Sequence, residues 1–144
     1  MEKIDSFSGE HRFLSNFWYH PIRMGGKLYP TNEHAFQAAK TLSPLQREMI
    51  QLAESPGMAK LLGRTVNLRD DWEEIKLDVM YQINLHKFAN GTLRDKLVAT
   101  GDAELIEGNH WGDKFWGVCD GEGQNHLGKI LMAVREEAKW WGKQ

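Results

Sequence analysis

The stretch from Tyr29 to Lys40, YPTNEHAFQAAK, constrains this chain most, because as a helix it aligns three polar side chains. Four residues separate Glu33 from Gln37 and seven separate Glu33 from Lys40. At roughly 3.6 residues per turn, each side chain returns to nearly the same direction, and we call these three residues the polar stripe. The opposite face carries the apolar residues Ala35, Ala38, Ala39 and Leu42.

A carboxylate, an amide and an amine held on one rigid helix face can form a catalytic site. The small residues opposite favour close packing of the helix backbone against a neighbour, which would fix the polar stripe in place. The same spacing also occurs on solvated helices with a Glu to Lys pattern, so spacing alone leaves both interpretations open.

Length and composition limit the class of protein. We expect residues 1–144 to form one domain, because chains of this size bury roughly two-thirds of their unfolded surface. The 18 basic and 20 acidic residues are interspersed, which gives no basic arm of the kind that coats long nucleic acids. No signal peptide and no stretch of ~20 apolar residues is present, so we expect a cytoplasmic protein without a membrane span.

Turn and capping signals predict the elements. Gly25 and Gly26 indicate a small N-terminal β-hairpin within a β-rich opening segment. Capping residues and first-turn prolines predict helices that begin at 31–32, 43–44, 55–56, 70–71, about 93 and about 125, with a strand at 104–107. The fold class is therefore mainly α (α+β), a compact multihelical domain with one hairpin.

Two further segments carry residues suited to binding. Gly108 to Asn125 combines two tryptophans, two aspartates and several glycines, and its end leads into the last helix, where free N–H groups can hold a phosphate. A plain capped helix is the more common explanation of that end, since the lysine and spacing of a P-loop are missing. In His11 to Trp18, Arg12 and Asn16 stand among aromatic residues, and if buried they need structural or ligand partners.

Metal and thiol chemistry find little support in the sequence. The six histidines show no metal-ligand spacing, and Cys119 has neither a partner cysteine nor a neighbouring base. We expect no metal, no cofactor and no disulfide, with Cys119 as a small buried thiol.

Taken together, five motifs resemble the YbiA/NADAR family, in order and over nearly the whole chain. They are RFLSNFW, PIRMGGKLYPTNEHAFQAAK, DDWEEIKLDVMYQINLHKF, NHWGDKFWG and GQNHLGKILMAVRE. The resemblance implies a mainly helical fold and hydrolysis of N-glycosidic bonds to ribose. The implied substrates are phosphoribosylamino pyrimidines of riboflavin synthesis, or ADP-ribose on guanine, including ADP-ribosylated DNA or RNA.

The resemblance also implies the site residues. The catalytic set is Glu33, Lys40 and Asp113, and the substrate-binding set is Arg12, Asn16, Phe17, Gln37, Trp111, Gly112 and Asn125. Trp111 would stack on the base or ribose, while Arg12 and the helix start at Asn125 would hold phosphate. The segment Phe115 to Val118 departs from the shorter, glycine-rich versions in riboflavin-linked relatives, which affects base specificity more than the reaction.

Two mechanisms and three functions remain open on these residues. In the first mechanism, Lys40 attacks ribose C1 in an imine exchange and Glu33 shuttles protons. In the second, Lys40 only binds phosphate, Glu33 activates water, and Asp113 acts as acid or stabilises positive charge at C1. The protein could instead be a non-catalytic sensor of NAD or ADP-ribose. A helical interaction protein would leave the polar stripe in solvent.

Overall fold

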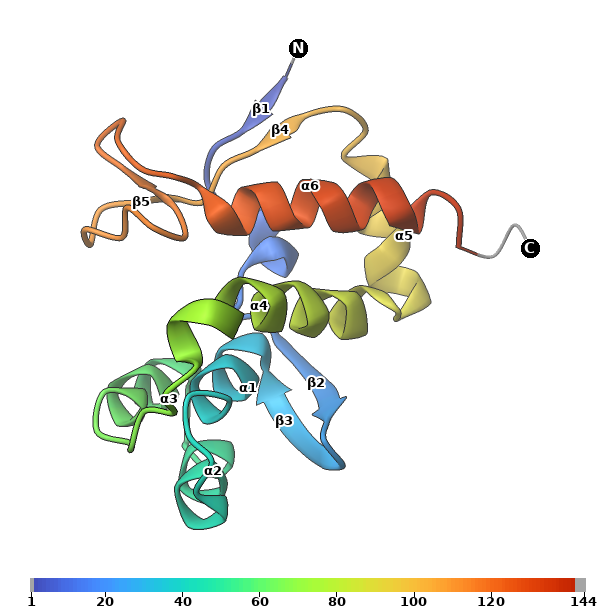
Figure 1. Cartoon of the computed structure of the whole chain (residues 1–144). Helices are drawn as coiled ribbons and strands as arrows, with labels where there is room; N and C mark the ends of the chain where they lie inside the picture. Colours follow the sequence, from blue (N-terminus) through green and yellow to red (C-terminus); the bar gives the residue numbers. More distant parts are fainter. Residues whose placement is uncertain (1, 142–144) are drawn as a thin grey trace. The chain divides into compact units, whose positions relative to one another are not determined.

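The computed structural model describes residues 2–141, and the chain divides into two compact units (Figure 1). Unit 1 comprises Met1–Ser15 and Phe88–Gln144, and unit 2 comprises Asn16–Lys87. Within the described part of the chain, no helix is long and apolar enough to cross a membrane.

Unit 2 is built around one short helix. Its elements are β2 (Tyr19–Met24), β3 (Lys27–Thr31), α1 (Asn32–Ala38), α2 (Pro44–Gln51), α3 (Pro56–Gly63) and α4 (Trp72–Phe88), whose last residue belongs to unit 1. The antiparallel β2 and β3 form the predicted hairpin, and α1 packs against both strands and against α2 and α3 (Figure 1). Ser43 and Ser55 cap α2 and α3 as predicted, since each side chain accepts a backbone N–H of the first turn.

Buried hydrogen bonds fix α1 within unit 2. The Thr31 hydroxyl accepts the His34 backbone N–H at 3.2 Å and lies 2.8 Å from Nδ1 of the same residue. Nε2 of His34 lies 3.1 Å from the Ala53 carbonyl, which can only accept, so Nε2 carries the proton and Nδ1 accepts from Thr31. Burial lowers the pKa of His34, in agreement with this neutral tautomer.

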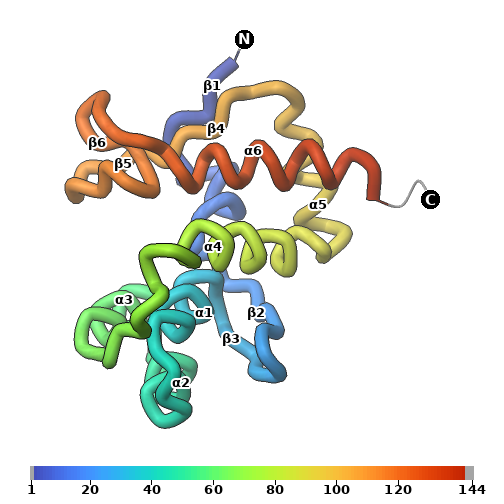
Figure 2. Tube along the Cα trace, in the orientation of Figure 1, coloured from blue at the N-terminus to red at the C-terminus, as the bar shows by residue number. Residues whose placement is uncertain are grey.

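Unit 1 contains α-helices and pairs of very short strands (Figure 2). Its elements are β1 (Lys3–Ile4), the 3₁₀ helix η1 (Gly9–Leu14), α5 (Gly91–Ala99), β4 (Glu104–Leu105), β5 (Gly108–Asn109), β6 (Val118–Cys119) and α6 (His126–Ala138). β1 pairs in parallel with β4, and β5 pairs in parallel with β6. α6 packs against α5 and β4.

The structure corrects three details of the sequence interpretation. The opening segment forms a 3₁₀ helix at Gly9–Leu14 before the hairpin begins, an element that was not predicted. α1 ends at Ala38, and Lys40 lies in the turn that follows, where its N–H binds the Gln37 carbonyl at 3.2 Å. Leu42 is therefore outside the helix, and it is 65% exposed.

Lys87, near the end of α4, is the most deeply buried lysine among residues 2–141, with 1% of its surface exposed. Burial lowers its pKa to about 7. Between that value and the unfolded pKa of 10.5, the unfolded chain binds more protons than the folded one, so stability should rise with pH across this window.

Lys87→Met should remove this pH dependence and leave the protein more stable at pH 7. The difference in the free energy of unfolding between wild type and Lys87→Met should shrink by up to about 1.4 kcal/mol per pH unit as pH rises toward 10. Urea unfolding at several pH values measures it, with the exposed Lys129→Met as control. Parallel pH curves for wild type and Lys87→Met would show that Lys87 stays charged in the folded protein.

Candidate active site

The polar stripe is buried, which decides between the two interpretations of its spacing. Glu33 is 8% exposed and Gln37 is 4% exposed. Nε2 of Gln37 donates to Oε2 of Glu33 at 2.6 Å, a short charge-assisted hydrogen bond. The solvated-face interpretation is therefore wrong, and so is the interaction-protein reading that required these side chains to be in solvent.

The backbone of Glu33 is held by a cluster of buried asparagines. Its N–H donates to the Asn16 carbonyl at 3.0 Å. Nδ2 of Asn32 donates to the side-chain oxygens of Asn16 at 3.2 Å and Asn84 at 3.0 Å, which ties the hairpin entry, α1 and α4 together. Asn16, predicted to bind substrate, thus has a clear positioning role toward Glu33.

Two buried acceptors on α1 have no hydrogen-bond partner. Within residues 2–141, the buried side-chain atoms without one are Oδ1 of Asn32 and Oε1 of Gln37. These residues flank Glu33, one position before it and four after it. The Gln37 amide cannot flip, because its oxygen would then face the Glu33 carboxylate. Unsatisfied buried acceptors are costly and rare, so their presence on both sides of Glu33 marks this region as a candidate ligand site.

Lys40 lies beside the same helix in a half-buried position, with its Nζ 5.9 Å from the centre of the Phe36 ring. Its pKa is lowered mainly by burial, and the nearby carboxylate of Glu33 opposes this shift. Three cations, Lys60, Arg64 and Lys76, lower the pKa of Lys40 further. Each of these effects except that of Glu33 favours the neutral amine, the form that can act as a nucleophile.

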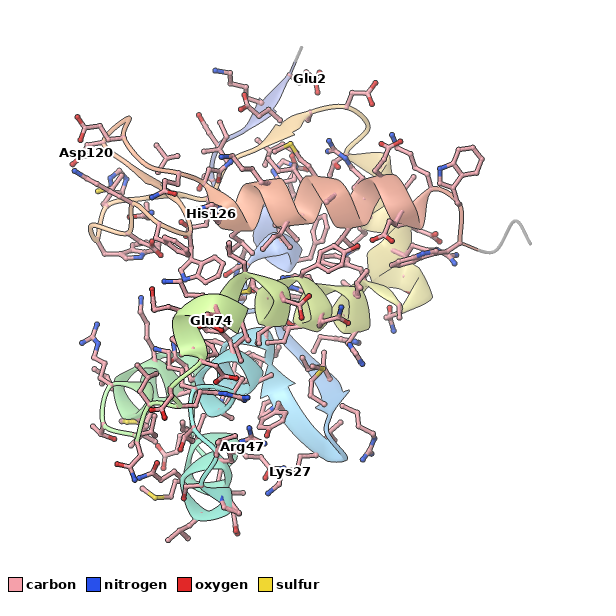
Figure 3. All side chains as sticks on the ribbon, viewed as in Figure 1. Glu2, Lys27, Arg47, Glu74, Asp120 and His126 are labelled. Atoms are coloured by element: carbon pink, nitrogen blue, oxygen red, sulfur yellow. The ribbon has the colours of Figure 1, made fainter. Side chains whose placement is uncertain are left out.

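The alanine face of α1 meets a different feature. Ala35 and Ala39 line a cavity of about 230 Å³ together with Tyr29, Asp78 and Arg47, the last of which is labelled in Figure 3. Nε of Arg47 is already committed to the Thr41 carbonyl at 2.6 Å. The cavity lining includes no member of the polar stripe, so we place the candidate active site on the opposite face of the helix.

Gly63, at the end of α3, fixes the position of Gln37. A Cβ at residue 63 would lie 1.8 Å from Oε1 of Gln37 and 2.7 Å from its Cδ. Because Gln37 is buried and hydrogen-bonded to Glu33, it cannot move away without breaking that bond.

We expect Gly63→Ala to lower turnover at least about tenfold, because it would displace Gln37 from its hydrogen bond to Glu33, and to cost about 1–3 kcal/mol of stability. Gly57→Ala is the matched control on the same helix, because its nearest contact would be Ser55 Oγ at an ordinary 3.8 Å. That control should be neutral or stabilising by up to about 1 kcal/mol. Normal turnover in Gly63→Ala would show that the position of Gln37 is irrelevant to the reaction.

In unit 1, the predicted residues Trp111, Gly112 and Asp113 form one loop. Trp111 is 65% exposed, so it is not part of a core, and Gly112 has a φ of +88° that favours glycine. Oδ1 of Asp113 accepts the backbone N–H groups of Phe115 at 3.1 Å and Trp116 at 2.9 Å. Asp113 therefore shapes this loop, and its predicted catalytic role stays a prediction.

Asn125 joins two parts of unit 1 directly before α6, whose first residue, His126, is labelled in Figure 3. Its Nδ2 donates to the Leu105 carbonyl at 2.9 Å, and its Oδ1 accepts the Glu107 N–H at 3.0 Å. The side chain makes no capping bond to α6. These contacts are structural, and phosphate binding by Asn125 stays a prediction.

The predicted binding residues from the RFLSNFW motif differ in burial. Arg12 is exposed, whereas Asn16 is buried. Phe17 is 42% exposed. The structure brings Asn16, Glu33, Gln37 and Lys40 together within unit 2.

The cations near Lys40 and the role of Gly63 were not predicted from the sequence. These residues lie on α3, directly after it, and on α4, and no local motif connects them to the polar stripe. In residues 2–141, no group of three or more His, Cys, Asp or Glu side chains is arranged to hold a metal ion.

Known proteins provide an independent comparison. The family model for the NADAR domain matches residues 5–139. N-glycosidase YbiA of Escherichia coli (strain K12) is 40% identical over 136 residues, covering 92% of this chain and 84% of that protein. A riboflavin biosynthesis protein of Vibrio vulnificus (strain YJ016) is 43% identical over 131 residues, covering 88% of this chain, which spans only 35% of the Vibrio protein.

A solved structure agrees with the sequence matches. The NMR structure of E. coli YbiA superposes with a TM-score of 0.84 at 38% identity, covering 96% of this chain and 87% of the other. Together, the comparisons confirm both the resemblance and the mainly α-helical α+β fold predicted from the sequence.

Proposed function

This chain belongs to the NADAR domain family, and from that premise we propose that it is an N-glycosidase acting on ribose joined through C1 to an exocyclic base amine. The observation that carries the proposal is the buried Glu33, flanked by two unsatisfied acceptors and accompanied by Lys40 with a lowered pKa. Perturbed ionisable groups of this kind are typical of catalytic sites.

The reaction we propose begins with opening of the ribose ring. The lone pair of the exocyclic nitrogen forms a C1=N imine as the bond between C1 and the ring oxygen breaks, and the ring oxygen takes up a proton. The neutral amine of Lys40 then adds to C1. Loss of the base amine, protonated by Glu33, leaves the sugar attached to Lys40 as an imine.

Water completes the cycle. It adds to the Lys40 imine, and Glu33 accepts a proton from it, so that the C–N bond to Lys40 breaks and the sugar leaves as an aldehyde that can close again to ribose. The net reaction consumes one water molecule and releases one base amine. The buried amides of Asn32 and Gln37 offer acceptors for sugar hydroxyl groups.

The substrate classes we propose follow the names of the relatives and the family resemblance. They are a phosphoribosylamino pyrimidine, as in riboflavin biosynthesis, and ADP-ribosylated guanine. Both have the exocyclic N-riboside that ring opening requires. The loop that contains Trp111 and the segment from Phe115 to Val118 are the candidates for base recognition.

The proposal is tested by incubating the protein with an ADP-ribosylated guanine oligonucleotide and, separately, with a phosphoribosylamino pyrimidine. The expected result is release of ADP-ribose from the oligonucleotide, or of ribose 5-phosphate and the free aminopyrimidine from the second compound, or both. Binding of both compounds without any release would instead support the sensor function.

A further inference from the structure

Three basic side chains approach Lys40 from two neighbouring helices. Lys60 and Arg64 come from the end of α3, and Lys76 comes from the second turn of α4. We call Lys60, Arg64 and Lys76 the basic cluster. All three belong to unit 2, together with the polar stripe.

Packing places the α3 side of this cluster next to the polar stripe. Gly63 is so close to Gln37 that a Cβ there would overlap its side chain. Arg64 follows directly as the residue that ends α3, and Lys60 lies four residues earlier, on the same helix face. Arg64 is exposed and Lys60 half-buried, so both side chains remain accessible to a ligand.

The part of the basic cluster that lies on α4 is positioned by an aromatic contact. The Trp72 ring packs on Phe36 with centroids 5.1 Å apart, and the same Phe36 ring lies 5.9 Å from Nζ of Lys40. Lys76 is four residues after Trp72 and therefore lies on the same face of α4. In addition, the Arg69 N–H donates to the Lys40 carbonyl at 2.8 Å, which ties the segment before α4 to this residue.

Several charged groups act on Lys40. Lys60, Arg64 and Lys76 all act on it as like charges, and Glu33 is the acid that acts on it in return. Lys76 is also paired with Glu73 on its own helix at 2.7 Å. Arginine and lysine are the side chains that proteins use to bind phosphate, so a group of three such residues beside Lys40 is suited to a phosphoryl group.

We propose that the basic cluster binds the phosphoryl group on the 5-oxygen of the substrate ribose, while C1 of the same sugar reaches Lys40. This inference rests on the proposed function and names the part of the substrate that both candidate classes share. A phosphate monoester occupies the site in a phosphoribosylamino pyrimidine, and the proximal phosphate of a diphosphate occupies it in ADP-ribose. Phosphate binding thus positions C1 for attack.

The first test compares an N-riboside with and without its 5-phosphate. Wild type should show at least a tenfold higher kcat/KM for the phosphorylated substrate, and Arg64→Ala or Lys76→Ala should reduce this ratio roughly tenfold, mainly through KM. The ratio cancels any change in the Lys40 pKa, because that change affects both substrates equally. Arg64→Lys should recover part of the preference, and Arg23→Ala in the exposed hairpin is the matched control.

A second test does not depend on turnover. Titration with ribose 5-phosphate, ADP-ribose and ribose should show tighter binding of the phosphorylated sugars, lost in Arg64→Ala and Lys76→Ala but kept in Arg23→Ala. This binding result supports the phosphate site even if no N-riboside is cleaved. Absence of cleavage would contradict only the proposed function. Equal affinity for ribose and ribose 5-phosphate, or an unchanged kcat/KM ratio in the variants, would overturn the phosphate site and leave the cluster as a modulator of Lys40.

Discussion

Glu33→Gln should reduce turnover by roughly 100-fold or more while leaving the fold intact. The glutamine keeps the shape of the side chain, and its carbonyl oxygen can still accept the hydrogen bond that Gln37 donates to Glu33. What it loses is the ability to give a proton to the departing base amine and to take one from water. The rate of sugar phosphate release under saturating substrate measures this effect.

The control for this variant is Glu74→Gln, an exposed carboxylate in the first turn of α4 that is labelled in Figure 3. It changes the same charge in the same unit without touching the polar stripe. Its turnover and thermal midpoint should match those of wild type. If Glu33→Gln also keeps near-normal turnover, Glu33 has no role in proton transfer and the catalytic assignment fails.

Local signals in the sequence were sufficient for most of the helices. Ser43 and Ser55 before their prolines mark helix starts because capping and proline geometry act within one turn. The parallel pairs β1 with β4 and β5 with β6 carried no such signal, since each has two residues per strand, and β1 pairs with a strand about a hundred residues further along the chain. The 3₁₀ helix at Gly9–Leu14 was likewise not predicted.

The candidate site also combines features with a local signal in the sequence and features that depend on packing between helices. Helical spacing predicted the polar stripe, because Glu33 and Gln37 are neighbours on one helix. Spacing could not show that the stripe is buried, nor that Arg64 and Lys76 approach Lys40, since these facts depend on how α3 and α4 pack around α1. Gly63 was missed for the same reason: its effect is a contact with Gln37 on another helix.

Lys40→Ala should abolish turnover almost completely if Lys40 is the nucleophile, a loss at least as large as that of Glu33→Gln. The activity of wild type should rise with pH, because only the neutral amine attacks C1. The lowered pKa of Lys40 means that this rise should be centred below 10.5, the value of an ordinary lysine. Removing the charge of Lys76 should move the centre to higher pH, since that charge helps to lower the pKa.

Borohydride added during turnover should reduce the imine and leave the sugar permanently attached to Lys40. Peptide mass spectrometry should then find the adduct on the peptide containing Lys40, and Lys40→Ala treated in the same way should yield none. Glu33→Gln should form the trapped adduct more slowly than wild type, because loss of the base amine, which Glu33 protonates, precedes the imine that borohydride reduces. Absence of an adduct together with substantial activity in Lys40→Ala would assign the attack on C1 to water activated by Glu33, and would leave Lys40 as a ligand for the phosphate.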